Sequence, residues 1–173
     1  MREVSEQFLL GVSGVAATLI GTFLVGVFFY LDSPLHRARR AGSASADRYM
    51  RAGARWVFVI YSIPVMMPLV LAGLTEVWGA VVFVVLGALL LASTVETTVR
   101  LLRARAMEVT AGLVVNEILT TLAVLVLLAL TWILGGWVPA AAAYTPSLLL
   151  AIMGGFASTT VLVMAVFRTA RSR

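Results

Sequence analysis

The feature that most constrains this chain is a run of 50 residues without a charged side chain, which covers residues 118–167. A single helix of that length would measure about 75 Å, more than twice the roughly 30 Å hydrocarbon core of a bilayer. The run must therefore turn once, and residues 135–146 contain the glycines and prolines that favour a turn. Two membrane-spanning helices are predicted here, over residues 112–134 and 147–167.

Three further apolar stretches with no charge or almost none cover residues 8–31, 56–74 and 77–99. The first has neither the basic start nor the small-residue cleavage site of a signal peptide. Long uninterrupted apolar runs indicate helices, because the strands of a membrane barrel alternate. With 61% hydrophobic and 12% charged residues, the chain is too apolar for a water-soluble core. We expect an all-α, polytopic membrane protein, a single transmembrane domain over residues 1–173 with five transmembrane helices.

The orientation of these helices follows from the 13 basic residues, which are all arginine. All but Arg2 fall on one side of the predicted topology, which the positive-inside rule assigns to the cytoplasm. The N-terminus is then outside, the C-terminus is cytoplasmic, and residues 32–55 form a basic cytoplasmic linker. The expected location is a prokaryotic cell (plasma) membrane. The net charge of +5 is attributed to orientation, so no nucleic-acid partner is expected.

The basic linker has two interpretations. It either rests on the membrane surface or binds anionic lipid through Arg37, Arg39 and Arg40. Each arginine near an anionic membrane surface is worth about 1 kcal/mol. The lipid bilayer is in both cases the first partner that the sequence predicts.

A carboxylate inside the span 112–134 is the first candidate for function, because ionisable groups in a membrane are costly. Glu117 lies there beside Asn116, and Thr121 follows one turn later on the face of Glu117. The sequence places no arginine within a turn of Glu117, so the carboxyl group should keep its proton, since desolvation disfavours the charged form. It is either a neutral donor to a facing helix or a proton or cation site.

A second polar cluster, which includes Ser93 and Glu96, lies near the end of the span 77–99. A short loop should bring this end close to the start of the span 112–134, and oxygen ligands suit protons or hard cations. The alternative for Glu96 is an ion pair with Arg100, four residues later in the helix. Serine and threonine in spans commonly only hydrogen-bond between helices.

Small residues recur every four positions in the span 8–31, at Gly14, Thr18, Thr22 and Gly26. Such a face lets two helix backbones approach closely. The pattern predicts a helix-packing face, whose partner helix lies in this chain or in another one.

Two prolines, Pro64 and Pro68, lie four residues apart in the span 56–74. Each removes a backbone donor and frees the carbonyl four residues earlier, at Ile60 and at Pro64. A kink that serves packing is common in membrane helices. The alternative is a hinge, or a permeation path lined by the freed carbonyls.

The residue types that are missing exclude several chemistries. The chain has no cysteine, and its one histidine is His36 in the linker. Disulfides, thiolate metal sites and bis-histidine haem ligation inside the bundle are therefore excluded. The predicted spans contain no histidine or lysine that could activate a serine. We expect no enzyme, no cofactor and no metal centre.

The expected function is a small oligomeric channel or transporter for protons or small cations, because a carboxylate inside a span is a functional site by default. Five helices rarely enclose a pathway alone, so a homo-oligomer is expected. The alternative is a non-catalytic membrane subunit or scaffold that packs against a partner membrane protein. An enzyme that acts on lipid through Glu96 or Glu117 ranks below both, since acid–base catalysis usually needs a matched pair of groups.

Overall fold

The computed structural model describes the backbone of residues 5–32, 44–104 and 111–171, and the side chains of residues 5–29, 53–99 and 118–160. Within these ranges the chain is all-helical, as the sequence predicts, and five helices are long and apolar enough to cross a membrane. They suggest a multi-pass membrane protein. The helices are α1 (Glu6–Asp32), α3 (Ala44–Gly73), α4 (Glu76–Ala104), α5 (Ala111–Gly135) and α6 (Ala141–Arg171).

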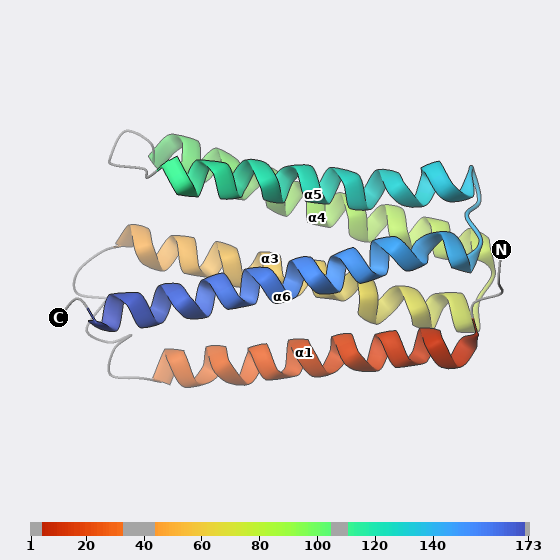
Figure 1. The fold of residues 1–173 in the computed structure, drawn as a ribbon, viewed down its shortest axis with the longest axis horizontal. Coiled ribbons are helices and arrows are strands. Elements are labelled where there is room, and N and C mark those ends of the chain that lie inside the picture. Colours follow the sequence, from red (N-terminus) through yellow and green to blue (C-terminus); the bar gives the residue numbers. More distant parts are fainter. Residues whose placement is uncertain (1–4, 33–43, 105–110, 172–173) are drawn as a thin grey trace.

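Helix α3 is the centre of the bundle (Figure 1). It packs against α1, α4 and α6, whereas α5 packs mainly on α6. The start of α1 and the end of α6 lie at opposite ends of the bundle. Helices α4 and α5 have few contacts with each other, and the loop that was expected to bring their ends together lies outside the described residues. Helix α4 also contacts α6: the ring of Phe83 packs edge-on against Tyr144, with 5.3 Å between ring centroids.

Two helices begin earlier than the charge pattern indicates. Helix α3 begins at Ala44, inside the stretch 32–55 that was assigned to the linker. Helix α6 begins at Ala141, so Pro146 lies inside the helix and not in the preceding turn. Pro146 is the sixth residue of α6, so the hydrogen bond to the carbonyl of Ala142 is missing there. Charge marks the limits of the apolar segment and does not mark the limits of the helix.

The turn between α5 and α6 is made by Gly136, which has a left-handed φ of 69°. Its N–H donates to the carbonyl of Trp132 at 3.0 Å and closes the end of α5. A side chain at this φ is strained, so glycine suits the position.

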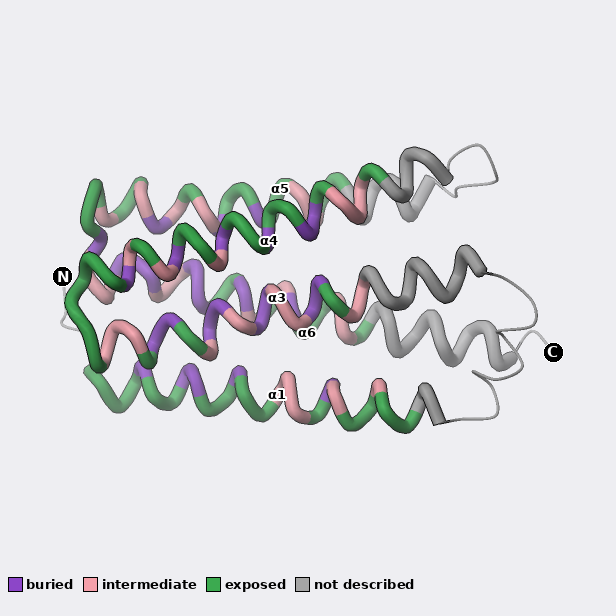
Figure 2. The backbone as a smooth tube through the Cα atoms, turned by 180° about the vertical axis from the view of Figure 1, so that it is seen from behind, coloured by how far each residue is buried: buried purple, intermediate pink, exposed green. Residues whose placement is uncertain are grey.

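Buried residues are concentrated along α3, whereas α1 and α5 are exposed over much of their described length (Figure 2). Val57, Ile63 and Met67 of α3 are fully buried. Large apolar side chains point outward, such as Phe29 at 75% exposure and Ile133 at 76%. An outward apolar surface of this kind fits a lipid surrounding.

Helix α1 packs on α3 through a face that the small residues do not form. Phe23 of α1 is buried and makes an edge-on ring contact with Phe58 at 5.6 Å between centroids. The Ser13 hydroxyl donates to the carbonyl of Val65 at 2.8 Å. The predicted packing residues are all exposed, and a Cβ at either of their two glycines would meet nothing within 4 Å. These residues, which no described helix of this chain covers, are Gly14, Thr18, Thr22 and Gly26.

Helix α3 continues through Pro64 and Pro68, and both prolines are buried. Neither proline frees the carbonyl that accepts the hydrogen bond from Ser13. That carbonyl belongs to Val65. The prolines thus lie on the inner side of α3, and whether they act as a kink or hinge stays a prediction.

Candidate functional site: a groove between α3, α5 and α6

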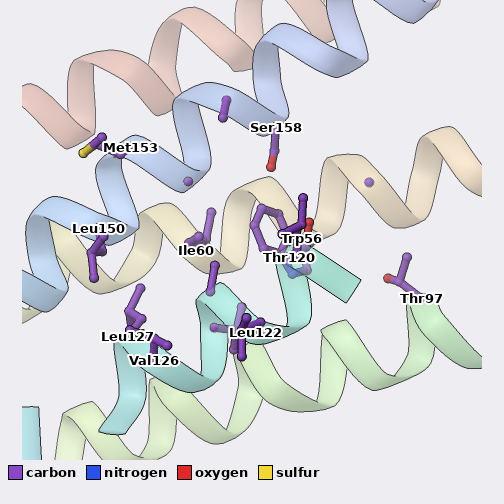
Figure 3. A pocket seen from close by; sticks show the side chains of 16 residues that line it. Trp56, Ile60, Thr97, Thr120, Leu122, Val126, Leu127, Leu150, Met153 and Ser158 are labelled. Carbon is purple, nitrogen blue, oxygen red and sulfur yellow. The ribbon is translucent and has the colours of Figure 1, made fainter. Parts of the chain in front are cut away.

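A pocket of about 640 Å³ lies between α3, α5 and α6, and we call it the groove (Figure 3). Pockets that bind small molecules in proteins commonly enclose about 300–1,000 Å³. Its lining is predominantly apolar and comes from four helices. The lining residues are Gly53, Trp56 and Ile60 of α3, Thr97 of α4, Leu119, Thr120, Leu122, Ala123, Val124, Val126 and Leu127 of α5, and Leu150, Met153, Gly154, Ala157 and Ser158 of α6.

One wall of the groove exists because two glycines let α6 approach α3 closely. A Cβ at Gly155 would lie 2.7 Å from the Tyr61 ring, and a Cβ at Gly154 would lie 3.1 Å from Ile60. The Tyr61 hydroxyl also hydrogen-bonds the Thr159 side chain. Helix α6 therefore lies against α3 along this segment, away from α5.

The residues that α6 turns toward α5 in the same segment are small. Ala157 and Ser158 both line the groove, and neither side chain is long enough to fill the space. Small side chains on one wall and close α3–α6 packing behind it leave the gap open.

Helix α5 is fastened to the rest of the bundle beyond the apolar end of the groove. The Thr131 and Ser147 hydroxyl oxygens lie 2.7 Å apart, and Ser147 donates to the carbonyl of Leu127 at 2.7 Å. Both hydroxyl residues are completely buried. Close packing adds to this attachment, because a Cβ at Gly87 of α4 would lie 2.6 Å from Leu128.

The two ends of the groove differ in polarity. In Figure 3, Thr97, Thr120 and Ser158 lie toward one end, and the hydroxyl of Ser158 points into the pocket. Leu127 and Leu150 lie toward the opposite end. The eight-residue separation of Leu150 and Ser158 along α6 corresponds to about 12 Å. The groove is thus about 12 Å long and largely apolar, with hydroxyl groups at one end.

Trp56 forms a fixed part of the groove lining. The side chain is 7% exposed, and its Nε1 donates to the Thr94 hydroxyl at 2.9 Å. The Thr94 hydroxyl in turn donates a hydrogen bond to the carbonyl of Leu90 at 2.9 Å. This chain of hydrogen bonds holds the indole in one orientation and ties α3 to α4.

An ion pair between Arg55 and Glu96 lies beside the polar end, since these residues directly precede Trp56 and Thr97 in sequence. Their side chains are 51% and 37% exposed. The structure shows Arg55 of the adjacent helix as a partner of Glu96, and the pair with Arg100 that the sequence suggested stays a prediction. The side chain of Arg100 lies outside the described residues. Glu96, which was predicted as an ion or proton ligand, is therefore a paired carboxylate in the structure.

The other predicted site residues are only partly described. Glu117 and Asn116 belong to α5, but their side chains lie outside the described residues, as do Arg37, Arg39 and Arg40. Thr121 is half-buried, and Ser93 is 7% exposed. Within the described residues the Ser93 hydroxyl has no hydrogen-bond partner.

Most of the described hydroxyls in the region where oxygen ligands were predicted form hydrogen bonds within their own helices. Several hydroxyls near the polar end donate to a carbonyl one turn earlier, which uses their protons within the helix. In the described part of the chain, no cluster of three or more acidic, histidine or cysteine side chains could hold a metal ion. The hydroxyls that donate in this way are those of Thr94, Thr97, Thr98, Thr159 and Thr160.

The groove itself was not predicted from the sequence. The small residues Gly154, Gly155 and Ser158 in the sequence suggest close packing of this helix, but they cannot show where that packing ends. Comparison of the chain with models of protein families, with curated proteins and with solved structures gave no match. The functional argument therefore depends on the geometry of the groove.

Proposed function

We propose that this chain is a membrane protein that binds amphipathic molecules of the bilayer, with a hydrocarbon chain of the ligand in the groove. The observation that carries the proposal is the polarity of the groove, which is apolar along most of its length and has hydroxyls at one end only. Its length of about 12 Å is close to half of the roughly 30 Å hydrocarbon core. That length matches a chain from one leaflet. No catalytic role is part of this proposal.

A hydrocarbon chain fits the groove better than a transmembrane helix does. A helix is a rigid cylinder about 10–12 Å across, and it cannot bend to follow a lining that comes from four helices. A narrow, flexible chain can follow the irregular lining of Ile60, Leu122 and Met153, which offers many apolar contacts. Burial of each CH₂ group away from water would be worth about 0.8 kcal/mol, but the bilayer is itself apolar. Binding must therefore come from shape and from the polar end.

We further propose that the polar end faces the cytoplasm. The arginine distribution supports this orientation, with the N-terminus outside and the C-terminus inside a prokaryotic plasma membrane. The groove would then open into the cytoplasmic leaflet. Labelling of cysteines introduced near each end of the chain, with a reagent that does not cross membranes, would test the orientation.

The binding proposal can be tested by fluorescence quenching. In a variant with the three other tryptophans replaced by phenylalanine, Trp56 is the single fluorophore, and a lipid with brominated acyl chains quenches it on contact. Because Trp56 is 7% exposed, bulk lipid has little access to it. We expect quenching that saturates with the fraction of brominated lipid. The replaced residues are Trp78, Trp132 and Trp137.

A groove-filling variant supplies the decisive comparison. Ala157→Leu places a large side chain in the groove, and Ala129→Leu makes the same change at an exposed position of α5 outside it. We expect Ala157→Leu to abolish most of the quenching and Ala129→Leu to leave it unchanged. Equal quenching in both variants would show that no chain occupies the groove.

Transport of protons or small cations is the second candidate. The favouring observation is that Glu117 lies in α5, less than one turn before Thr120, which lines the groove. A homo-oligomer would be needed, because the described core of one chain is filled by large side chains such as Tyr61 and Phe83. Ion flux into proteoliposomes tests this candidate, and the same flux in Glu117→Gln would remove the role of the carboxylate.

A scaffold role is favoured by one observation, the uncovered small-residue face of α1. A Cβ at Gly14 or Gly26 would meet nothing within 4 Å among the described residues, so a loss of assembly in bulky variants would report an external partner. Co-purification of the Gly14→Leu/Gly26→Leu variant with membrane proteins, compared with the unmodified chain, tests this role. Identical recovery of all partners would argue against it.

A further inference from the structure

We infer that the groove favours a hydrocarbon chain that bends about ten carbons from its head group, such as a cis-unsaturated acyl chain, over a straight chain of equal length. This inference rests on the proposed function, because it names the kind of chain that the groove binds. It follows from the length of the groove, from its closed apolar end and from its open side.

The groove is closed at its apolar end because α5 and α6 meet there. The Ser147 hydroxyl of α6 donates to the main-chain carbonyl of Leu127 at 2.7 Å, and Leu127 is the last residue of α5 that lines the groove. A side chain that reaches the backbone of the facing helix leaves no room for a ligand between the two helices. Thr131, one turn farther along α5, is completely buried, and its hydroxyl oxygen lies 2.7 Å from that of Ser147. A straight chain that enters from the polar end therefore stops at Leu127.

The space up to this stop holds about ten carbons of an extended chain. Leu119 and Leu127 mark the two ends of the groove along α5, and their separation corresponds to about 12 Å of helix. A C–C bond of about 1.5 Å at a tetrahedral angle advances an extended chain by about 1.25 Å, so about ten bonds cover that distance. A chain that spans half of the roughly 30 Å hydrocarbon core has at least about twelve bonds. The far part of such a chain must therefore leave the groove.

The open side of the groove determines the direction in which the chain leaves. Leu122 and Val126 of α5 and Met153 of α6 line the groove and are also exposed on the outside of the bundle. On the inner side, Ile60 and Val124 line the groove and are buried. The chain can thus bend outward into the bilayer but not inward into the core. A cis double bond supplies this bend in advance, whereas a saturated or trans chain must give up rotational freedom to adopt it.

The experiment compares two lipids that differ only in the geometry of one double bond. The full chain with Trp56 as its single tryptophan is placed in fluid vesicles that contain a fixed fraction of brominated phosphatidylcholine. The remaining phosphatidylcholine has either a cis or a trans double bond, in both cases about ten bonds from the head group. The lipid that occupies the groove more strongly excludes the brominated lipid and lowers the quenching of Trp56. We expect the cis lipid to bind roughly two- to tenfold more strongly, the effect of a bend that is fixed in advance.

A second comparison moves the cis double bond along the chain and shortens the groove. In the unmodified groove, a double bond much closer to the head group or much farther from it should bind less strongly. Ala123 lines the groove midway between Leu119 and Leu127, so Ala123→Phe should move the preferred double bond toward the head group. Ala129→Phe is the matched control, because Ala129 is exposed on α5 and does not line the groove. It should leave the preferred position unchanged.

The possible results separate the inference from the proposed function. Equal binding of the cis and trans lipids would overturn the inference and leave the proposed function intact. A preferred double-bond position that Ala123→Phe does not change would have the same meaning. If brominated lipid quenches Trp56 equally with and without Ala157→Leu, then no lipid chain occupies the groove, and both proposals are wrong. Cross-linking of Ala157→Cys to a second copy of the chain would identify protein as the occupant and would also overturn both.

Discussion

Replacing Gly155 by alanine tests the close approach of α6 to α3, on which the groove depends. A Cβ at this position would lie 2.7, 2.8 and 3.0 Å from three atoms of the Tyr61 ring. The Tyr61 side chain is 1% exposed, so its ring cannot move without displacing its core neighbours. We therefore expect the substitution to push α6 away from α3.

The size of the effect follows from two opposing terms. Overpacking of a well-filled interior costs about 1–3 kcal/mol, whereas replacing glycine by alanine within a helix gains about 0.5–1 kcal/mol. Gly26→Ala contains only the second term, because a Cβ at Gly26 in α1 would meet nothing described within 4 Å. The difference between the two variants therefore isolates the first term. Relative to Gly26→Ala, Gly155→Ala should lower the free energy of unfolding by about 1–3 kcal/mol.

The assay is unfolding by sodium dodecyl sulfate in mixed micelles, followed by the circular dichroism of the helices. Tyr61→Leu supplies a second measurement, because leucine lacks the ring atoms that the new Cβ would contact. The loss in Gly155→Ala/Tyr61→Leu should be smaller than the sum of the two single losses, since residues in contact couple by about 0.5–3 kcal/mol. Equal stability of Gly155→Ala and Gly26→Ala, or strict additivity in the double variant, would refute the reasoning.

Three further substitutions can be measured in the same micelles. Thr131→Val should destabilise the chain by about 0.6–1.7 kcal/mol, because it removes the hydroxyl 2.7 Å from that of Ser147; unchanged stability would contradict the bond. Tyr144→Phe should leave stability unchanged or increase it, because the buried Tyr144 hydroxyl has no partner among the described residues, and a clear loss would reveal one. Gly136→Ala should cost about 1–2 kcal/mol, because its φ of 69° disfavours a side chain; a neutral result would mean that the turn adopts another conformation.

The helices could be predicted because one physical quantity, the cost of charge in a bilayer, decides both their number and their approximate place. The stretch between Glu117 and Arg168 had to contain two helices whatever its detailed sequence. The ends were less predictable. Helix α3 starts at Ala44, before the apolar segment begins, because helical backbone persists where arginine side chains can reach water.

The groove could not be predicted because it depends on distances between helices far apart in sequence. Spacing along one helix suggests Arg100 as a partner of Glu96 but cannot suggest Arg55, which pairs with Glu96 and lies 41 positions away. Similarly, the regular spacing of small residues in α1 indicated a packing face, whereas α6 uses Gly154 and Gly155 side by side against α3. A pattern of small residues identifies where helices can approach, and the tertiary fold decides which of these positions is used.

The attachment of α5 has a consequence for how a molecule reaches the interior from the surrounding membrane. The described contacts that secure this helix, such as Thr131 with Ser147, lie beyond the apolar end of the groove, toward the Gly135 turn. Leu119, Leu122 and Val126 of α5 line the groove and are also exposed on the outside of the bundle, so the groove can be reached from its side. Entry would then proceed sideways from the leaflet, and a ligand would never have to cross an aqueous phase.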